Sequence, residues 1–198
     1  MLKIGVTGGI GSGKSTICRI FQVLGIPVYY ADAEAKKLMQ SDPALVSAIR
    51  EHFGAEAYEG SGRLNRVFLA SQVFGDTGKL VLLNSLVHPV TIRDADRWAG
   101  QQSSAYVLKE AALMFESEAF HHVDKVIGVS APSALRISRT MRRDQVDRAE
   151  VLRRMENQLD EGIKMRLCDY VVYNDEQRAV IPQVLKLHEM LIGLATPG

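Results

Sequence analysis

The chain has 198 residues, of which 46% are hydrophobic and 24% are charged, so it can bury one compact core and is too apolar for a disordered protein. Its 24 basic and 23 acidic residues leave a formal charge of +1, which excludes a global field that would recruit nucleic acid or an anionic membrane. We therefore expect neither as a partner, and any recognition of charged ligands must be local.

Strands and helices alternate in the predicted secondary structure. In chain order we expect a strand at 2–7, a helix at about 14–24, strands at 26–30, 106–108, 123–129 and 169–173, and a closing helix from about residue 177. Strands and helices joined in this order are typical of a parallel α/β sheet, here with five strands. Polar residues interrupt the late apolar stretch 179–195, which favours an amphipathic terminal helix over a membrane span.

Two long stretches exceed this simple alternation. Residues 33–97 show helical periodicity between the second and third strands, and residues 136–166 form an arginine-rich helical stretch between the fourth and fifth. We expect one functional unit over 1–198. Its parts are a core at about 1–32, 98–135 and 167–198, a helical substrate-side domain at about 33–97, and a mobile lid at about 136–166.

A glycine-rich segment links the first strand to the first helix. Its sequence, GGIGSGKS at 8–15, fits the pattern G-x-x-x-x-G-K-[ST] of a P-loop. Glycines let backbone N–H groups approach phosphate oxygens, and the helix adds the positive end of its dipole. We expect Lys14 to reach the β and γ phosphates and the Ser15 hydroxyl to bind Mg²⁺. The predicted nucleotide-binding residues are Gly9, Gly11, Ser12, Gly13, Lys14, Ser15 and Thr16.

The motif by itself does not separate kinases from other P-loop proteins. A GTPase would carry an N-K-x-D tetrad, which this sequence lacks, and the chain is short for a motor domain. Two hypotheses remain at this point. One is a small-molecule kinase that moves the terminal phosphate of ATP onto a hydroxyl, and the other is an ATP-dependent switch or binding module.

Two acidic residues follow predicted strands. Ligands of an open parallel sheet bind outside the carboxyl ends of the strands, so Asp32 is placed to accept the proton of an incoming hydroxyl. An N-cap of a helix at 33–39 explains this aspartate equally well. Glu110 ends the third strand and would act on water molecules bound to Mg²⁺, unless it is a surface charge paired with Lys109.

Within the arginine-rich stretch, residues 136–154 carry an excess of four positive charges. The seven arginines of 136–154 are Arg136, Arg139, Arg142, Arg143, Arg148, Arg153 and Arg154. Asp147 and Glu150 form a D-x-x-E capping signature, which predicts a helix–turn–helix with its bend near Gln145. Guanidinium groups brought over a triphosphate by a closing lid would neutralise charge and exclude water. The alternative is a solvated basic face, to which some of the seven must belong.

With these motifs assembled, the chain resembles the dephospho-CoA kinase family along nearly its whole length. The resemblance rests on the order and spacing of VTGGIGSGKST, YYADAEAKKL, HFG, GRLNRVFLASQVF, LNSLVHP, EAALMFES, RTMRRD, RRMENQ and DYVVYN. It implies an adenylate-kinase-like core and transfer of the ATP γ-phosphate to the ribose 3′-hydroxyl of dephospho-CoA, with Mg²⁺, as the last step of CoA biosynthesis. Another P-loop nucleoside, nucleotide or metabolite kinase is the alternative.

The resemblance also implies roles for single residues. Asp32 matches the acidic residue proposed as the base, and Arg139 and Arg143 match lid positions near the phosphates, with Arg139 in a catalytic role. Arg66 and His88 in the helical domain match positions on the acceptor side. Asn174, beyond the last strand, matches the region around the adenine of ATP.

The chain departs from the family pattern at a few positions. Glu110 stands where many members have Asp, which keeps the charge but lengthens the arm, and Ala112 replaces a proline, which suggests a less rigid turn. Asn65 stands where Asp is frequent in the family, which weakens any claim that this position must be charged. His88 also has a structural explanation beside Pro89.

Cysteine usage indicates the compartment. Cys18 and Cys168 have no metal-type or C-x-x-C spacing, and the N-terminal apolar run is too short for a signal peptide. We expect a cytoplasmic protein that is monomeric or only weakly self-associating.

Overall fold

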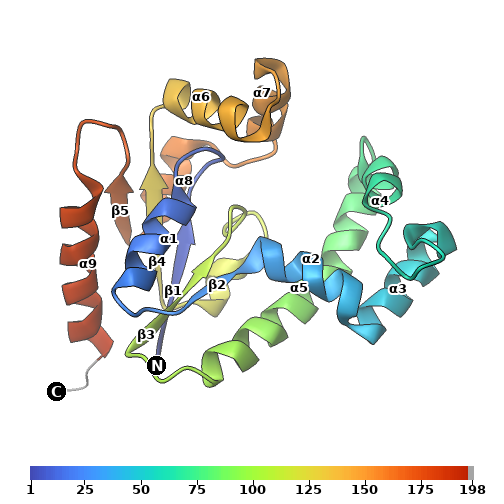
Figure 1. The fold of residues 1–198 in the computed structure, drawn as a ribbon, viewed down its shortest axis with the longest axis horizontal. Helices are drawn as coiled ribbons and strands as arrows, with labels where there is room; N and C mark the ends of the chain where they lie inside the picture. The colour runs from blue at the N-terminus through green and yellow to red at the C-terminus, as the bar shows by residue number, and fades with distance from the viewer. Residues whose placement is uncertain (196–198) are drawn as a thin grey trace. The chain divides into compact units, whose positions relative to one another are not determined.

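The computed structural model describes residues 1–195 and contains a five-stranded sheet in the order β2-β3-β1-β4-β5 (Figure 1). The strands are β1 (Leu2–Thr7), β2 (Val28–Tyr30), β3 (Tyr106–Glu110), β4 (Lys125–Ser130) and β5 (Tyr170–Tyr173). All neighbouring strands run parallel, which confirms the predicted α/β class. The end of the predicted core segment 167–198 lies outside the described residues.

The chain divides into two compact units. The first unit comprises Met1–Tyr30 and the described residues from Trp98 onward. Its helices are α1 (Lys14–Val23), η2 (Ala119–His122), α6 (Ser133–Asp144), α7 (Arg148–Glu156), α8 (Glu161–Leu167) and α9 (Val180–Ala195). The second, Ala31–Arg97, contains α2 (Ala31–Ser41), α3 (Pro43–Phe53), η1 (Ala55–Ala57), α4 (Arg66–Val73) and most of α5 (Thr77–Gly100). No helix within residues 1–195 combines the length and apolar character needed to cross a bilayer.

Successive side chains of a strand point to opposite faces of the sheet, and here the two faces carry different residues and are covered by different elements. One face packs against α1 and α9 in a core that includes Ile4, Val6, Phe21, Ile127 and Leu191. The opposite face carries Gly5 and Gly128, where a Cβ would lie 2.9 Å from Met114 and 2.8 Å from Met165. The glycines therefore allow α8 and the segment after β3 to pack directly on the strand backbone.

The second unit has its own apolar core. Its fully or nearly buried members include Leu45, Ile49, Phe53, Leu64, Leu69 and Val87. Asp42 caps α3 by accepting a hydrogen bond from Leu45 N–H (2.9 Å), and Asn65 caps α4 by accepting one from Phe68 N–H (3.1 Å). An N-cap needs an acceptor oxygen and no charge, which explains how Asn65 can stand where Asp is frequent in the family.

Three boundaries show how local chemistry sets the elements. β2 begins at Val28 instead of residue 26, because Pro27 has no N–H to give to the ladder. α9 begins at Val180 instead of residue 177, because the Asp175 side chain accepts from the amides of residues 177 and 178 and closes a turn there. The predicted bend is confirmed: Gln145 is left-handed, and Asp147 caps α7.

Candidate active site

The phosphate-binding loop, residues 8–16, follows β1 and leads into α1. Gly11 and Gly13 have φ of +76° and +95°, a backbone conformation that L-residues other than glycine rarely adopt. Ser12 N–H donates to Gly9 O (3.1 Å) and closes a tight turn. The backbone thus requires glycine at position 13, which the motif fixes, and also at position 11, which the motif leaves variable.

Lys14 brings a positive charge onto this loop. Its Nζ donates to Gly8 O at 2.9 Å and to Gly9 O at 3.4 Å, and the residue is only 9% exposed. Ser15, the second residue of α1, is exposed. An ammonium group, a helix N-terminus and an accessible hydroxyl therefore meet at one place, which suits binding of a phosphate chain.

Helix α6 packs directly against the loop. A Cβ on Gly9 would lie 2.5 Å from Arg136 Cζ, and one on Gly11 would lie 2.2 Å from Arg136 O. Arg136 is only 5% exposed, and its Nε donates to Ile10 O (3.2 Å). Arg136 is therefore a buried support of the loop, a role that no sequence pattern distinguishes among the seven arginines.

Asn174 and Arg139 also lie at this loop. Asn174 Nδ2 donates to Ser12 O (2.8 Å), and a Cβ on Gly13 would lie 2.2 Å from the same nitrogen. Arg139 donates to Asn174 O (3.1 Å) and pairs with Glu176 (2.9 Å). The structure thus brings both predicted residues together with the loop, from α6 and from the segment after β5.

Arg143 has a different environment at the end of α6. Its side chain is 61% exposed, and its Nε pairs with Asp144 at 2.7 Å. A hydrogen bond from Arg143 is the main reason why the pKa of the Asp144 carboxyl lies below its ordinary value. In this conformation the Arg143 guanidinium is engaged by its neighbour in the chain, and its predicted contact with phosphates stays a prediction.

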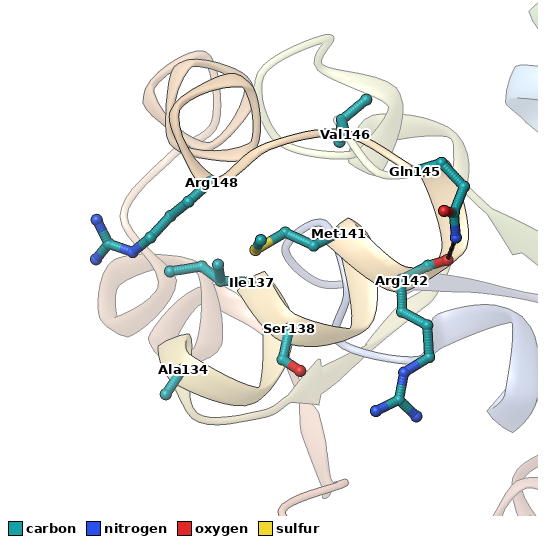
Figure 2. Close-up of a pocket in the computed structure, with 8 residues that line it drawn as sticks. All are labelled: Ala134, Ile137, Ser138, Met141, Arg142, Gln145, Val146 and Arg148. Carbon is teal, nitrogen blue, oxygen red and sulfur yellow. Dashed lines mark hydrogen bonds between the residues drawn. The ribbon is translucent and has the colours of Figure 1, made fainter.

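A groove of about 680 Å³ lies on another face of α6, between this helix and the start of α7 (Figure 2). Its lining residues are Ala134, Ile137, Ser138, Met141, Arg142, Gln145, Val146 and Arg148. At 3.6 residues per turn, the α6 residues of the groove centre on the side of the helix that faces away from Arg136 and Thr140, the two residues that contact the loop. The groove is therefore not the nucleotide site, and Arg142 and Arg148 belong to an exposed basic surface.

Glu110 ends β3, where it is in register with Val6 of β1 and Tyr30 of β2. Burial raises the pKa of the Cys18 thiol most, the charge of Glu110 raises it further, and Lys14 lowers it. Both charges therefore act on the same buried thiol of α1. Glu110 thus lies at the carboxyl edge of the sheet, as its position at the end of the strand predicted.

The other predicted residues belong to the second unit. Asp32 is exposed in the first turn of α2, and because this helix already begins at Ala31, the N-cap explanation for Asp32 is wrong. Arg66 is the exposed first residue of α4. His88 is half-buried on α5 directly before Pro89, which lies inside that helix.

The fold and the loop define a P-loop kinase. A crystal structure of shikimate kinase from Bacteroides thetaiotaomicron shares this fold, with a TM-score of 0.54 at 16% identity over 96% of this chain and 98% of that one. A structure from Thermus thermophilus superposes with a TM-score of 0.82 at 28% identity, covering 99% of this chain and 98% of the other.

Sequence comparisons narrow the class. The family profile described as dephospho-CoA kinase matches residues 2–179. The dephospho-CoA kinase of Salinibacter ruber is 43% identical over 88% of this chain and 89% of its own, and that of Bacteroides fragilis is 33% identical over 94% and 91%. The chain belongs to the dephospho-CoA kinase family and is an ATP-dependent kinase, as the sequence motifs predicted.

The sequence did not predict the contacts of three residues with the loop: Arg136, which was placed only among the lid arginines, and Gln158 and Glu161, which had no predicted role. Gln158 ends the RRMENQ segment, which carried the resemblance without a role, so a signal existed for this residue. Glu161 stands in no motif. Its contact with the loop depends on how α8 approaches β1, which only the tertiary structure specifies.

Proposed function

We propose that the chain transfers the γ-phosphate of ATP to the 3′-hydroxyl of the ribose of dephospho-CoA, which yields CoA and ADP. The observation that carries this proposal is the phosphate-binding loop with Lys14 Nζ lying against it, in a chain of the dephospho-CoA kinase family. Phosphoryl transfer needs positioning and charge stabilisation more than covalent chemistry, and this loop supplies both.

The nucleotide side is assigned to the first unit. Residues 9 and 11–16 form the loop that surrounds the phosphates, and Lys14 Nζ exchanges its carbonyl partners for β- and γ-phosphate oxygens. Arg139 neutralises charge that develops during transfer, and the backbone around Asn174 lies along the adenine. Arg143 joins them when the arginine-rich stretch at 136–166 acts as a lid.

Mg²⁺ fits the residues at the loop. The exposed Ser15 hydroxyl is a direct ligand, and Glu110 orients water molecules of the ion; one or two protein oxygens are the usual protein share for Mg²⁺ bound to a nucleotide. When bound, the ion supplies positive charge to the β- and γ-phosphate oxygens.

The acceptor side is assigned to the helical unit at about 33–97. Asp32 follows β2 by two residues and accepts the proton of the 3′-hydroxyl as the base. Arg66 is exposed at the start of α4, where its guanidinium and the helix N-terminus both favour the anionic groups of dephospho-CoA. His88 is assigned to the same acceptor.

We place the enzyme in a reducing compartment, the cytoplasm. Cys18 and Cys168 are both free thiols, and burial is the main reason why their pKa values are raised, for Cys168 to about 12. Protonated thiols of this kind are poor nucleophiles and oxidise slowly.

The test is release of ADP from ATP and Mg²⁺ with dephospho-CoA as the acceptor, set beside AMP, CMP and shikimate. We expect turnover with dephospho-CoA and turnover at least about 100-fold slower with the other three compounds, because a site that hydrogen-bonds its own substrate discriminates against others by at least this factor. Turnover with AMP or CMP but not dephospho-CoA would reassign the acceptor. ATP hydrolysis that no acceptor accelerates would favour a nucleotide-dependent switch.

A further inference from the structure

The two amides near the start of the phosphate-binding loop are bonded by side chains from residues 158–161. Gly9 N–H donates to Glu161 Oε2 (3.1 Å), and Ile10 N–H donates to Gln158 Oε1 (2.8 Å). Ser12 N–H donates to Gly9 O and Thr16 N–H donates to Gly13 O, so four loop amides already have protein acceptors. The phosphates of a nucleotide must therefore be held by the other amides of the loop.

Arg136 completes this arrangement from α6. Its Nη1 pairs with the same Glu161 Oε2 at 2.8 Å, and its Nε donates to Ile10 O. Both backbone polar groups of Ile10 are thus engaged, and the carboxylate that lies against Gly9 is neutralised. Neutralisation matters, because an uncompensated carboxylate bonded to the loop would repel a triphosphate bound there.

A loop with several glycines has many alternative conformations, and a nucleotide that had to order it would bind less tightly. Contacts that occupy its first amides remove part of this freedom in advance. We propose that Gln158 and Glu161 are positioning residues, which hold the start of the phosphate-binding loop in the conformation that binds the nucleotide. This inference rests on the ATP-dependent function proposed above.

Gln158→Met and Gln158→Asn test the inference in the full chain. Methionine keeps the length without the acceptor oxygen, and asparagine keeps the amide but is too short to reach Ile10 N–H. Calorimetric titration with ATP and Mg²⁺, without acceptor, should show a Kd about tenfold higher in both variants, as expected for one lost hydrogen bond. KM for dephospho-CoA should be unchanged, and kcat should stay within about twofold.

Asn157→Ala is the matched control, because its exposed side chain donates only within α7, to Arg153 O. It should bind ATP like the wild type. If both Gln158 variants bind ATP with the wild-type Kd, the inference is wrong. This holds also if their melting temperature is lower, since that would be a merely structural effect.

The wild-type protein separates this inference from the proposed function. If it binds ATP but does not phosphorylate dephospho-CoA, the proposed acceptor is wrong and the test of Gln158 still applies. If it does not bind ATP, both proposals are wrong.

Discussion

Asp32 is an exposed carboxylate in the first turn of α2, a place compatible with the positive end of the helix dipole. It makes no N-cap, so capping does not explain why an acidic residue stands here. A base has to be accessible to the hydroxyl that it deprotonates, and exposure satisfies this requirement. The helix dipole and a catalytic role both account for an acidic residue here, and the activity of an Asp32 variant distinguishes them.

Replacement of Asp32 by asparagine should lower kcat by about 10²–10⁴-fold, because the amide cannot take the proton of the acceptor hydroxyl. The Kd for ATP and Mg²⁺ should change little, since the variant keeps size and polarity. Glu34→Gln is the control: Glu34 lies in the same first turn and pairs with Lys37 at 2.7 Å. Single-turnover rates measure the chemical step, and full activity of Asp32→Asn would show that another group is the base.

At the scale of elements, the phosphate-binding loop and α6 form one packed arrangement. Gly11 combines a left-handed φ with a neighbouring backbone so close that a Cβ would lie 2.2 Å from Arg136 O. Gly25, after α1, has a similar φ of +82°, but no atom lies within 4 Å of its Cβ position. The two glycines therefore separate the cost of backbone conformation from the cost of a lost fit against α6.

Gly25→Ala should lower the free energy of unfolding by about 1 kcal/mol, the cost of an L-residue in the left-handed region. Gly11→Ala should lower it by clearly more and should weaken ATP binding at least about tenfold, because the loop or α6 has to shift. Urea denaturation and calorimetry measure both quantities. If Gly11→Ala binds ATP like the wild type and loses no more stability than Gly25→Ala, the loop does not depend on α6.

Over the whole first unit, distant segments are joined by a buried ion pair. Lys164 of α8 is 0% exposed, and its Nζ pairs with Glu116 Oε1 at 2.9 Å and donates to Ala112 O at 3.1 Å. Burial opposes ionisation of Glu116, but hydrogen bonds from Lys164 and from Leu159 N–H outweigh it, so the pKa of this carboxyl lies below its ordinary value. The pair connects the segment after β3 with α8, on the sheet face that carries the glycines.

Glu116→Gln should lower the free energy of unfolding by about 3 kcal/mol at pH 7, because it leaves the buried Lys164 ammonium uncompensated. A lowered folded pKa stabilises the protein above the unfolded pKa near 4.5, and this contribution is lost as the pH falls through the folded value. The difference between wild type and variant should therefore shrink below pH 4.5 in urea denaturation. As a control, Glu34→Gln removes an exposed ion pair and should lower the free energy of unfolding by at most about 1 kcal/mol at any pH. If the difference between wild type and Glu116→Gln does not change with pH, the carboxylate of Glu116 does not stabilise the protein through its pair with Lys164.

Features set by short-range chemistry were predictable from the sequence. The glycines and Lys14 of the loop, the Asp147 cap and the bend at Gln145 each depend on a few neighbouring residues, and the structure has them as expected. The five strands followed from apolar runs between turn residues. The start of β2 shifted at Pro27, and the start of α9 shifted at the Asp175 turn, because an average propensity does not register a single missing or diverted hydrogen bond.

Residue types and their spacing along the chain specified the strands, the phosphate-binding loop and the family. The tertiary structure alone decided that Arg136, Gln158 and Glu161 contact the loop. Among seven similar arginines, Arg136 is buried on glycine backbone while Arg143 pairs with its neighbour, and Gln158 and Glu161 reach amides far away in sequence. The reason is physical: burial and partner choice arise from the packing of α6 and α8 on β1 and its loop, and no local pattern in the chain encodes that packing.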